Sequence, residues 1–185
     1  MDASGRLPFV VANTVVFFDN VPAPLLFVEA SSIMCFVPFE ALSGAEITVA
    51  SNGQSSNAVK MGIVASAPQV LSIVNQDGNL NSPDDPAKAG SVITIYVSGL
   101  GQTSPPGADG LLNANPLPVP LAAVTVYFPT TPSAVTPQFL GAAVGMIAGI
   151  TQVNVQVPAT VPVSGTTSPI AIEVNFAGAK VYTTR

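Results

Sequence analysis

The sequence predicts an all-β protein of two tandem sandwich modules, on the evidence of its composition, its strand periodicity and an internal repeat. The 185-residue chain is 48% hydrophobic and 8% charged, which is the reverse of the composition that keeps chains disordered. Its 18 prolines and 15 glycines favour short strands joined by turns, because proline breaks helices. The length accommodates two immunoglobulin-like modules of roughly 100 residues each.

Strand-like runs recur at short intervals along the chain. Val153, Val155 and Val157 alternate with polar residues, as strands of a half-buried antiparallel sheet do. Turn-forming clusters, such as residues 51–54 and 75–78, separate the runs. We therefore expect strands at residues 13–18, 25–29, 33–37, 46–50, 59–64, 92–98, 124–128, 152–157, 170–176 and 180–183.

An internal repeat relates the two halves of the chain. Residues 15–17, 33–38 and 47–49 match residues 124–126, 153–158 and 172–174 in the same order. The offset between matched segments grows from 109 to 120 to 125, so the second copy has the longer connections. We therefore expect one module at residues 1–66 and a second at residues 67–185.

The first module is expected to be incomplete at its N-terminal edge. The second copy has a leader of residues 68–98 before its matched strands, whereas residues 1–12 precede those of the first. A missing strand leaves an exposed sheet edge, which pairs readily with another chain. This predicts a protein partner, or self-association, through an exposed strand edge.

Several ordered segments resemble an uncharacterised family of C-terminal domains. They are residues 21–28, 37–38, 75–83, 86–90 and 98–103, followed by Pro106 and residues 109–110. The chain resembles, from about Thr14 onward, the domains at the ends of large exported proteins of Solibacter-type acidobacteria. The resemblance implies tandem immunoglobulin-like domains in an extracellular or cell-surface setting, and it implies no activity. The chain departs from the family pattern at residues 32–34 of the first module and at the acidic pair Asp84-Asp85.

The charge pattern argues against nucleic acid as a partner. The net charge is -5, and the five cationic residues are scattered, whereas phosphate binding needs clustered Lys or Arg. The longest apolar stretch, residues 139–150, is shorter than the roughly 20 residues of a membrane-spanning helix, so we expect no membrane insertion. Its glycines favour a turn between two strands. No export signal is recognisable in this chain.

No catalytic residues stand out, so we expect no enzyme. The chain has no histidine, which removes the commonest base for a serine or cysteine nucleophile. Cys35, the only cysteine, lies in an apolar run and is expected to be buried. The candidate paired carboxylates of the second module all lie in turns, where aspartate hydrogen-bonds to the local backbone.

Calcium is the one possible cofactor that the sequence suggests. Oxygen ligands alternate along one loop, as they do at the start of calcium-binding loops. The candidate ligands are Asp77, Asn79, Asn81, Asp84 and Asp85. The same Asp77-Gly78 pair is also typical of a hairpin turn. Glycan binding is a further alternative, although the chain has no tryptophan and three tyrosines to form an aromatic platform.

Adjacent aromatic residues suggest a contact surface. In a strand, Phe17 and Phe18 point to opposite sides, as do Tyr127 and Phe128, so one of each pair faces outward. Phe18 and Tyr127 are the candidate interaction residues. The sequence thus predicts a non-catalytic structural, adhesive or anchoring module at the C-terminus of an exported bacterial protein, with a calcium- or glycan-binding module as the alternative.

Overall fold

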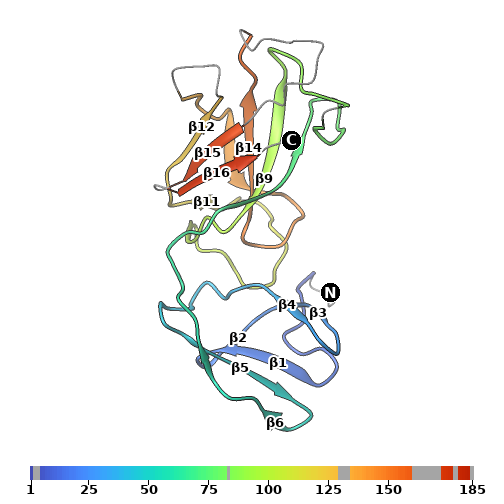
Figure 1. The fold of residues 1–185 in the computed structure, drawn as a ribbon, viewed down its shortest axis with the longest axis vertical. Coiled ribbons are helices and arrows are strands. Elements are labelled where there is room, and N and C mark those ends of the chain that lie inside the picture. Colours follow the sequence, from blue (N-terminus) through green and yellow to red (C-terminus); the bar gives the residue numbers. More distant parts are fainter. Residues whose placement is uncertain (2–4, 83, 129–133, 160–171, 177–178, 184–185) are drawn as a thin grey trace.

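The computed structural model describes residues 1, 5–82, 84–128, 134–159, 172–176 and 179–183. Its described secondary structure consists of strands and turns, arranged in several antiparallel sheets, so the all-β, sandwich-type fold class is confirmed. Two bodies follow one another along the long axis of the molecule (Figure 1), with β1 to β6 in one and β9 to β16 in the other.

The first module is built from two sheets. In the larger sheet the strand order is β2-β1-β5-β6, and β7 also pairs with β5; the smaller sheet is the hairpin β3-β4. Asn52 and Gly53 connect β5 to β6 with positive φ angles of 50° and 79°, as a tight hairpin turn requires. The bounds are β1 Thr14–Phe18, β2 Val21–Pro22, β3 Leu25–Val28, β4 Ile33–Cys35, β5 Glu46–Ser51, β6 Gln54–Ser55 and β7 Val59–Lys60.

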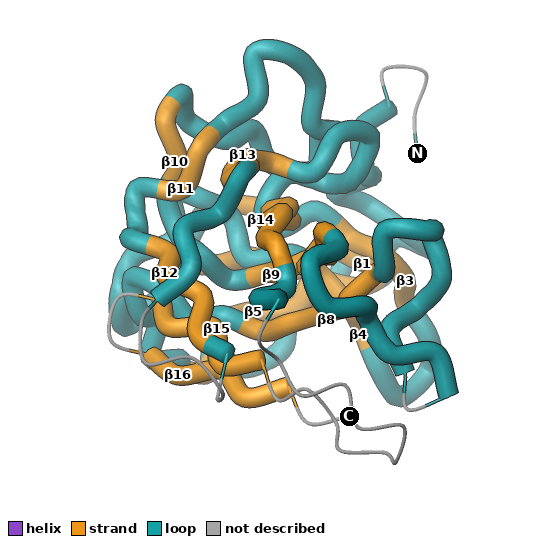
Figure 2. The backbone as a smooth tube through the Cα atoms, turned by 90° about the horizontal axis from the view of Figure 1, so that it is seen from above, coloured by secondary structure: helices purple, strands orange, loops and turns teal. Residues whose placement is uncertain are grey.

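The second module has a four-stranded sheet, β13-β14-β9-β8, and a three-stranded sheet, β12-β15-β16. A short ribbon of β10 and β11 lies in the connection between β9 and β12. The bounds are β8 Gln69–Val74, β9 Val92–Ser98, β10 Thr103–Ser104, β11 Val119–Pro120, β12 Val124–Tyr127, β13 Phe139–Ala142, β14 Ile150–Gln156, β15 Ile172–Phe176 and β16 Ala179–Thr183. Viewed along the long axis (Figure 2), β15 and β16 run side by side, and Phe176 pairs with Ala179.

Each module has its own apolar core. The core of the second module includes Ile93, Ile95 and Val97 of β9 and, on the neighbouring strand β14, Val153 and Val155; all five are fully buried. The core of the first module has fewer buried residues in the described part of the chain: Val16, Phe18, Ala23, Leu25 and Ala45. The first module therefore derives less stability from burial, which scales with the apolar area removed from water.

The strand pairing corrects the alignment of the two halves at the first repeat segment. Val16 pairs with Val49 in the first module, and Val126 pairs with Val174 in the second. Val16 is therefore the counterpart of Val126, an offset of 110 rather than the 109 that the sequence match suggested. A slip of one residue turns every side chain of a strand to the other face of the sheet.

The apolar stretch at residues 139–150 forms no helix. Its first four residues are β13, its last residue begins β14, and a turn at Gly145 with φ 72° connects them. The predicted glycine-containing turn is present, but it is shorter than the stretch of residues 139–150, because the first four residues form β13. Among the described residues no helix is long and apolar enough to span a membrane.

Candidate functional site

The richest polar site lies at the junction of the two modules. The loop between β9 and β12 meets the N-terminal segment and the turn that follows β4. Phe39 N donates to Asp109 Oδ1 at 3.0 Å, and Arg6 Nε donates to the Asp109 carbonyl at 2.9 Å. Leu7 N donates to the Gly110 carbonyl at 2.8 Å. These bonds join residues far apart in sequence, so they define the arrangement of one module against the other.

Glycines let the second module approach the first at this junction. A Cβ atom at Gly107 would lie 2.5 Å from Cζ of the Phe39 ring, closer than real side chains approach. Gly110 has φ 71°, and a Cβ atom there would lie 3.0 Å from Cβ of Pro24. The turn cluster at residues 105–110 therefore needs glycine at both places, for close packing and for a left-handed backbone.

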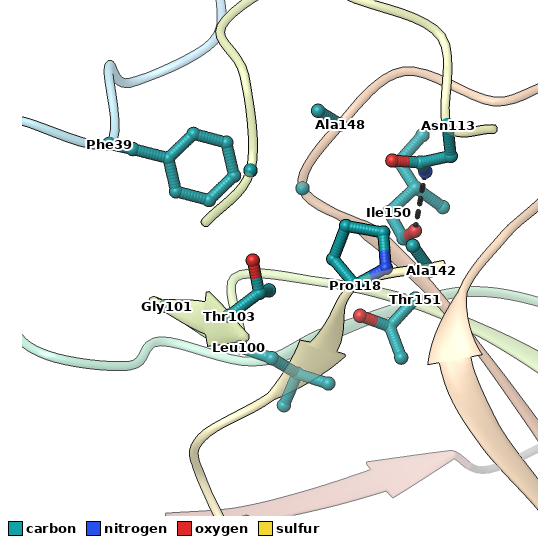
Figure 3. A pocket seen from close by; sticks show the side chains of 12 residues that line it. Phe39, Leu100, Gly101, Thr103, Asn113, Pro118, Ala142, Ala148, Ile150 and Thr151 are labelled. Carbon is teal, nitrogen blue, oxygen red and sulfur yellow. Dashed lines mark hydrogen bonds between the residues drawn. The ribbon is translucent and has the colours of Figure 1, made fainter. Parts of the chain in front are cut away.

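A small pocket opens beside this contact (Figure 3). Phe39 of the first module borders it, and Leu100, Thr103 and Pro118 of the second module line it. None of its lining residues is titratable, so the pocket offers no acid, base or charged nucleophile.

Asn113 organises the wall of this pocket. Its buried side-chain amide donates to the carbonyls of Ala143 at 3.0 Å, Ile147 at 3.3 Å and Ile150 at 3.3 Å. The last of these bonds is drawn as a dashed line in Figure 3. Each of these carbonyls also accepts from a backbone N–H, so the amide adds a second hydrogen bond to each and ties the turn after β13 to the start of β14.

The surroundings of Asp109 at the junction shift the acidity of its carboxyl group. Burial at the junction raises the pKa of Asp109 from 3.8 to about 6. The hydrogen bond from Phe39 N lowers this pKa, the neighbouring Glu40 carboxyl raises it, and the Arg6 guanidinium lowers it. Asp109 is therefore a structural carboxylate whose protonation is coupled to the contact between the modules.

The candidate calcium ligands lie in a loop that is held by its own hydrogen bonds. The buried Asn75 donates from Nδ2 to the Asp85 carbonyl at 2.8 Å and accepts at Oδ1 from Asn81 Nδ2 at 3.0 Å. Asp77 Oδ1 accepts from Asn79 N at 3.1 Å, as in an Asx turn. The amides and Asp77 are thus engaged in shaping the loop between β8 and β9.

The three aspartates of this loop do not come together. Asp77 and Asp84 are exposed, and Asp85 is half-buried. Nowhere in the described part of the chain do three or more His, Cys, Asp or Glu side chains gather in a way that could hold a metal ion. The described residues therefore offer no assembled carboxylate site for calcium.

One of the two aromatic pairs faces differently from what the sequence suggested. Phe18 is 3% exposed and belongs to the core of the first module, so the prediction that it faces outward is wrong. Strand β1 buries Thr14, Val16 and Phe18 and turns the half-buried Phe17 to the other face. In the second module Tyr127 is half-buried beside the fully buried Phe128. Since Val16 corresponds to Val126, the counterpart of Tyr127 is Phe17.

Cys35 is half-buried in β4, on the face that packs against the first core. Desolvation raises the pKa of its thiol, which keeps the thiol protonated and slows its reaction as a nucleophile.

Sequence reasoning did not single out Phe39 or Asn113. Two glycines in the cluster of residues 105–110 were the signal for a close approach, but which segment approaches depends on the tertiary structure.

No family model matches the chain, and no curated protein matches it.

Proposed function

We propose that this chain is a non-catalytic structural module, a pair of immunoglobulin-like sandwiches that anchors or spaces the remainder of an exported bacterial protein at the cell surface. The observation that carries the proposal is the junction, where both backbone and side-chain bonds join the modules. A stiff junction between domains is what a spacer needs, because a flexible linker would let the modules move independently.

The strand order supports the immunoglobulin-like assignment of the second module. Its sheets run β8-β9-β14-β13 and β12-β15-β16. This is the order A-B-E-D and C-F-G of constant-type immunoglobulin domains. In the first module β3-β4 and β1-β5 correspond to D-E and C-F of the same scheme.

The use of the acidic residues supports a non-catalytic role. Asp109 holds the junction, Asp77 holds a turn, and Asp19 Oδ1 accepts from Glu46 N at 2.9 Å. Each of these carboxylates bonds to the backbone, and the pocket at the junction has no titratable lining residue. A screen with esterase, glycosidase and peptidase substrates should therefore show no turnover above that of the heat-unfolded chain, and turnover that purified with the chain would refute the non-catalytic assignment.

The stiff junction is tested with the substitution Gly107→Ala. The added methyl group displaces the Phe39 ring, because no space exists between them. Small-angle X-ray scattering should then show a broader distribution of distances between the modules than in the unsubstituted chain. Gly62→Ala is the matched control, since nothing lies within 4 Å of its added Cβ atom and its φ is not positive. Equal scattering from both variants would mean that the contact does not stiffen the molecule.

A further inference from the structure

The two modules differ at the counterparts of one strand. β4 of the first module corresponds to β14 of the second: Val28 pairs with Ile33 just as Leu140 pairs with Val153. Each of these four residues contributes to the core of its own module. Ile33, Cys35 and Val37 therefore occupy the positions of Val153, Val155 and Val157.

In the second module another strand covers the far edge of β14. β9 pairs with β14 along its whole length, from Ile150 opposite Ser98 to Gln156 opposite Val92. The pairing continues beyond the strand, since Val157 N donates to the Ser91 carbonyl at 2.8 Å. β14 is thus an interior strand with partners on both sides.

The corresponding edge of β4 is open. Within the described ranges of the chain, β3 is the one strand that pairs with β4. The exposures show the consequence: Val157 is 1% exposed, whereas Val37 at the equivalent position is 52% exposed. On the opposite face of the strand, Met34 is 49% exposed. An unpaired edge flanked by exposed apolar side chains is a template for strand addition.

We propose that the open edge of β4 binds an extended strand of a partner polypeptide with the chemistry of β9. That chemistry is an uncharged strand with β-branched aliphatic residues at alternate positions, running antiparallel to β4. In the second module β9 covers the corresponding edge, so β9 shows which kind of strand completes this sheet. The inference adds a partner to the proposed structural role, and it rests on β4 rather than on the junction.

The second module also supplies the register. Val155 lies opposite Ile93, and Val153 lies opposite Ile95. On β4 the partner's two aliphatic residues would therefore lie opposite Cys35 and Ile33. A second copy of this chain is a poorer partner, because its own β9 already lies between β8 and β14.

Cys35 makes the register testable, because it is the only cysteine in the chain. The probe is a synthetic peptide of residues 88–100 with Ile93→Cys, whose sulfur carries 2-nitro-5-thiobenzoate as a leaving group. The Cys35 thiolate attacks the peptide sulfur, the nitrothiobenzoate departs with the electron pair of the broken S–S bond, and the thiol proton passes to the buffer. Directly opposed residues of antiparallel strands lie about 4.5–5.5 Å apart at Cα, which a disulfide spans.

The matched control peptide carries Thr94→Cys instead, which points to the other face of the added strand. We expect the first peptide to release nitrothiobenzoate about tenfold faster than the second, with a rate that saturates as the peptide concentration rises. In the full chain, Val37→Lys should abolish this saturation, because it places a charge where the peptide's apolar face would lie. Val59→Lys, at a residue that is 55% exposed on β7, should leave it unchanged.

Three outcomes would overturn the proposal. Equal rates for the two peptides would show that the thiol reacts without a defined strand register. A rate that stays proportional to peptide concentration would show that no complex forms before the exchange. A chain that light scattering finds to be dimeric, with Cys35 protected in the dimer, would show that a second copy occupies the edge. Failure of the Gly107→Ala experiment would leave these results unaffected, since the two tests use different residues.

Discussion

The asymmetry between the modules predicts unequal responses to one substitution at matched positions. Val157 and Val37 each precede a proline just after the corresponding strand, and they are 1% and 52% exposed. Val157→Ala removes two buried carbon groups at about 0.8 kcal/mol each and leaves a cavity, which together cost roughly 2–3 kcal/mol. Val37→Ala removes a side chain that is half in water and leaves an open site, so we expect about 0.5–1 kcal/mol.

The distribution of aromatic residues provides the assay. The chain has no tryptophan, and its three tyrosines, Tyr96, Tyr127 and Tyr182, all belong to the second module. Tyrosine fluorescence therefore reports the unfolding of that module, whereas far-ultraviolet circular dichroism reports both. Val157→Ala should lower the midpoint of the tyrosine transition by roughly 10 °C, and Val37→Ala should lower the midpoint of the first module, followed by circular dichroism, by about 5 °C or less.

Equal destabilisation by the two substitutions would refute the reasoning. It would mean that Val37 is covered in solution as fully as Val157. A destabilisation by Val37→Ala that grew with protein concentration would show that self-association covers Val37, since mass action makes the stability of an oligomer depend on concentration.

Two further predictions concern the junction and the pocket wall. The pKa of Asp109 is raised in the folded chain, so the folded state binds this proton more tightly and the contribution of Asp109 to stability falls as pH rises from 3.8 to about 6. Asp109→Asn keeps an oxygen that accepts from Phe39 N and does not titrate. As the pH rises through this window, the melting temperature of the variant should therefore rise relative to that of the unsubstituted chain. A difference between the two melting temperatures that stays constant with pH would contradict the assignment. Asn113→Ala removes a buried amide that bonds three carbonyls, and should cost roughly 2–3 kcal/mol in urea unfolding. The exposed Asn57→Ala should cost less than about 0.5 kcal/mol, and equal costs would refute the role of Asn113.

Local periodicity predicted many of the strands but not those with weak local patterns. β9 and β14 alternate cleanly and lie where the sequence placed them. β8 was not predicted as a strand, and a register shift between Val70 and Ser72 disturbs its pairing with β9. β13 contains Gly141, which lowers strand propensity, so the sequence indicated a turn over the whole stretch. The strand expected at residues 59–64 is limited to Val59–Lys60.

The sequence determined by itself the all-β class and the face of each strongly alternating strand, because these depend on composition and on neighbours one or two residues apart. It did not determine that Phe18 is buried and Phe17 is turned to the other face, because the repeat alone does not define register to a single residue. The tertiary structure decided the register through pairing with β5. It also decided that Phe39 meets Gly107 and that β4 has an open edge, since both depend on which distant segments meet.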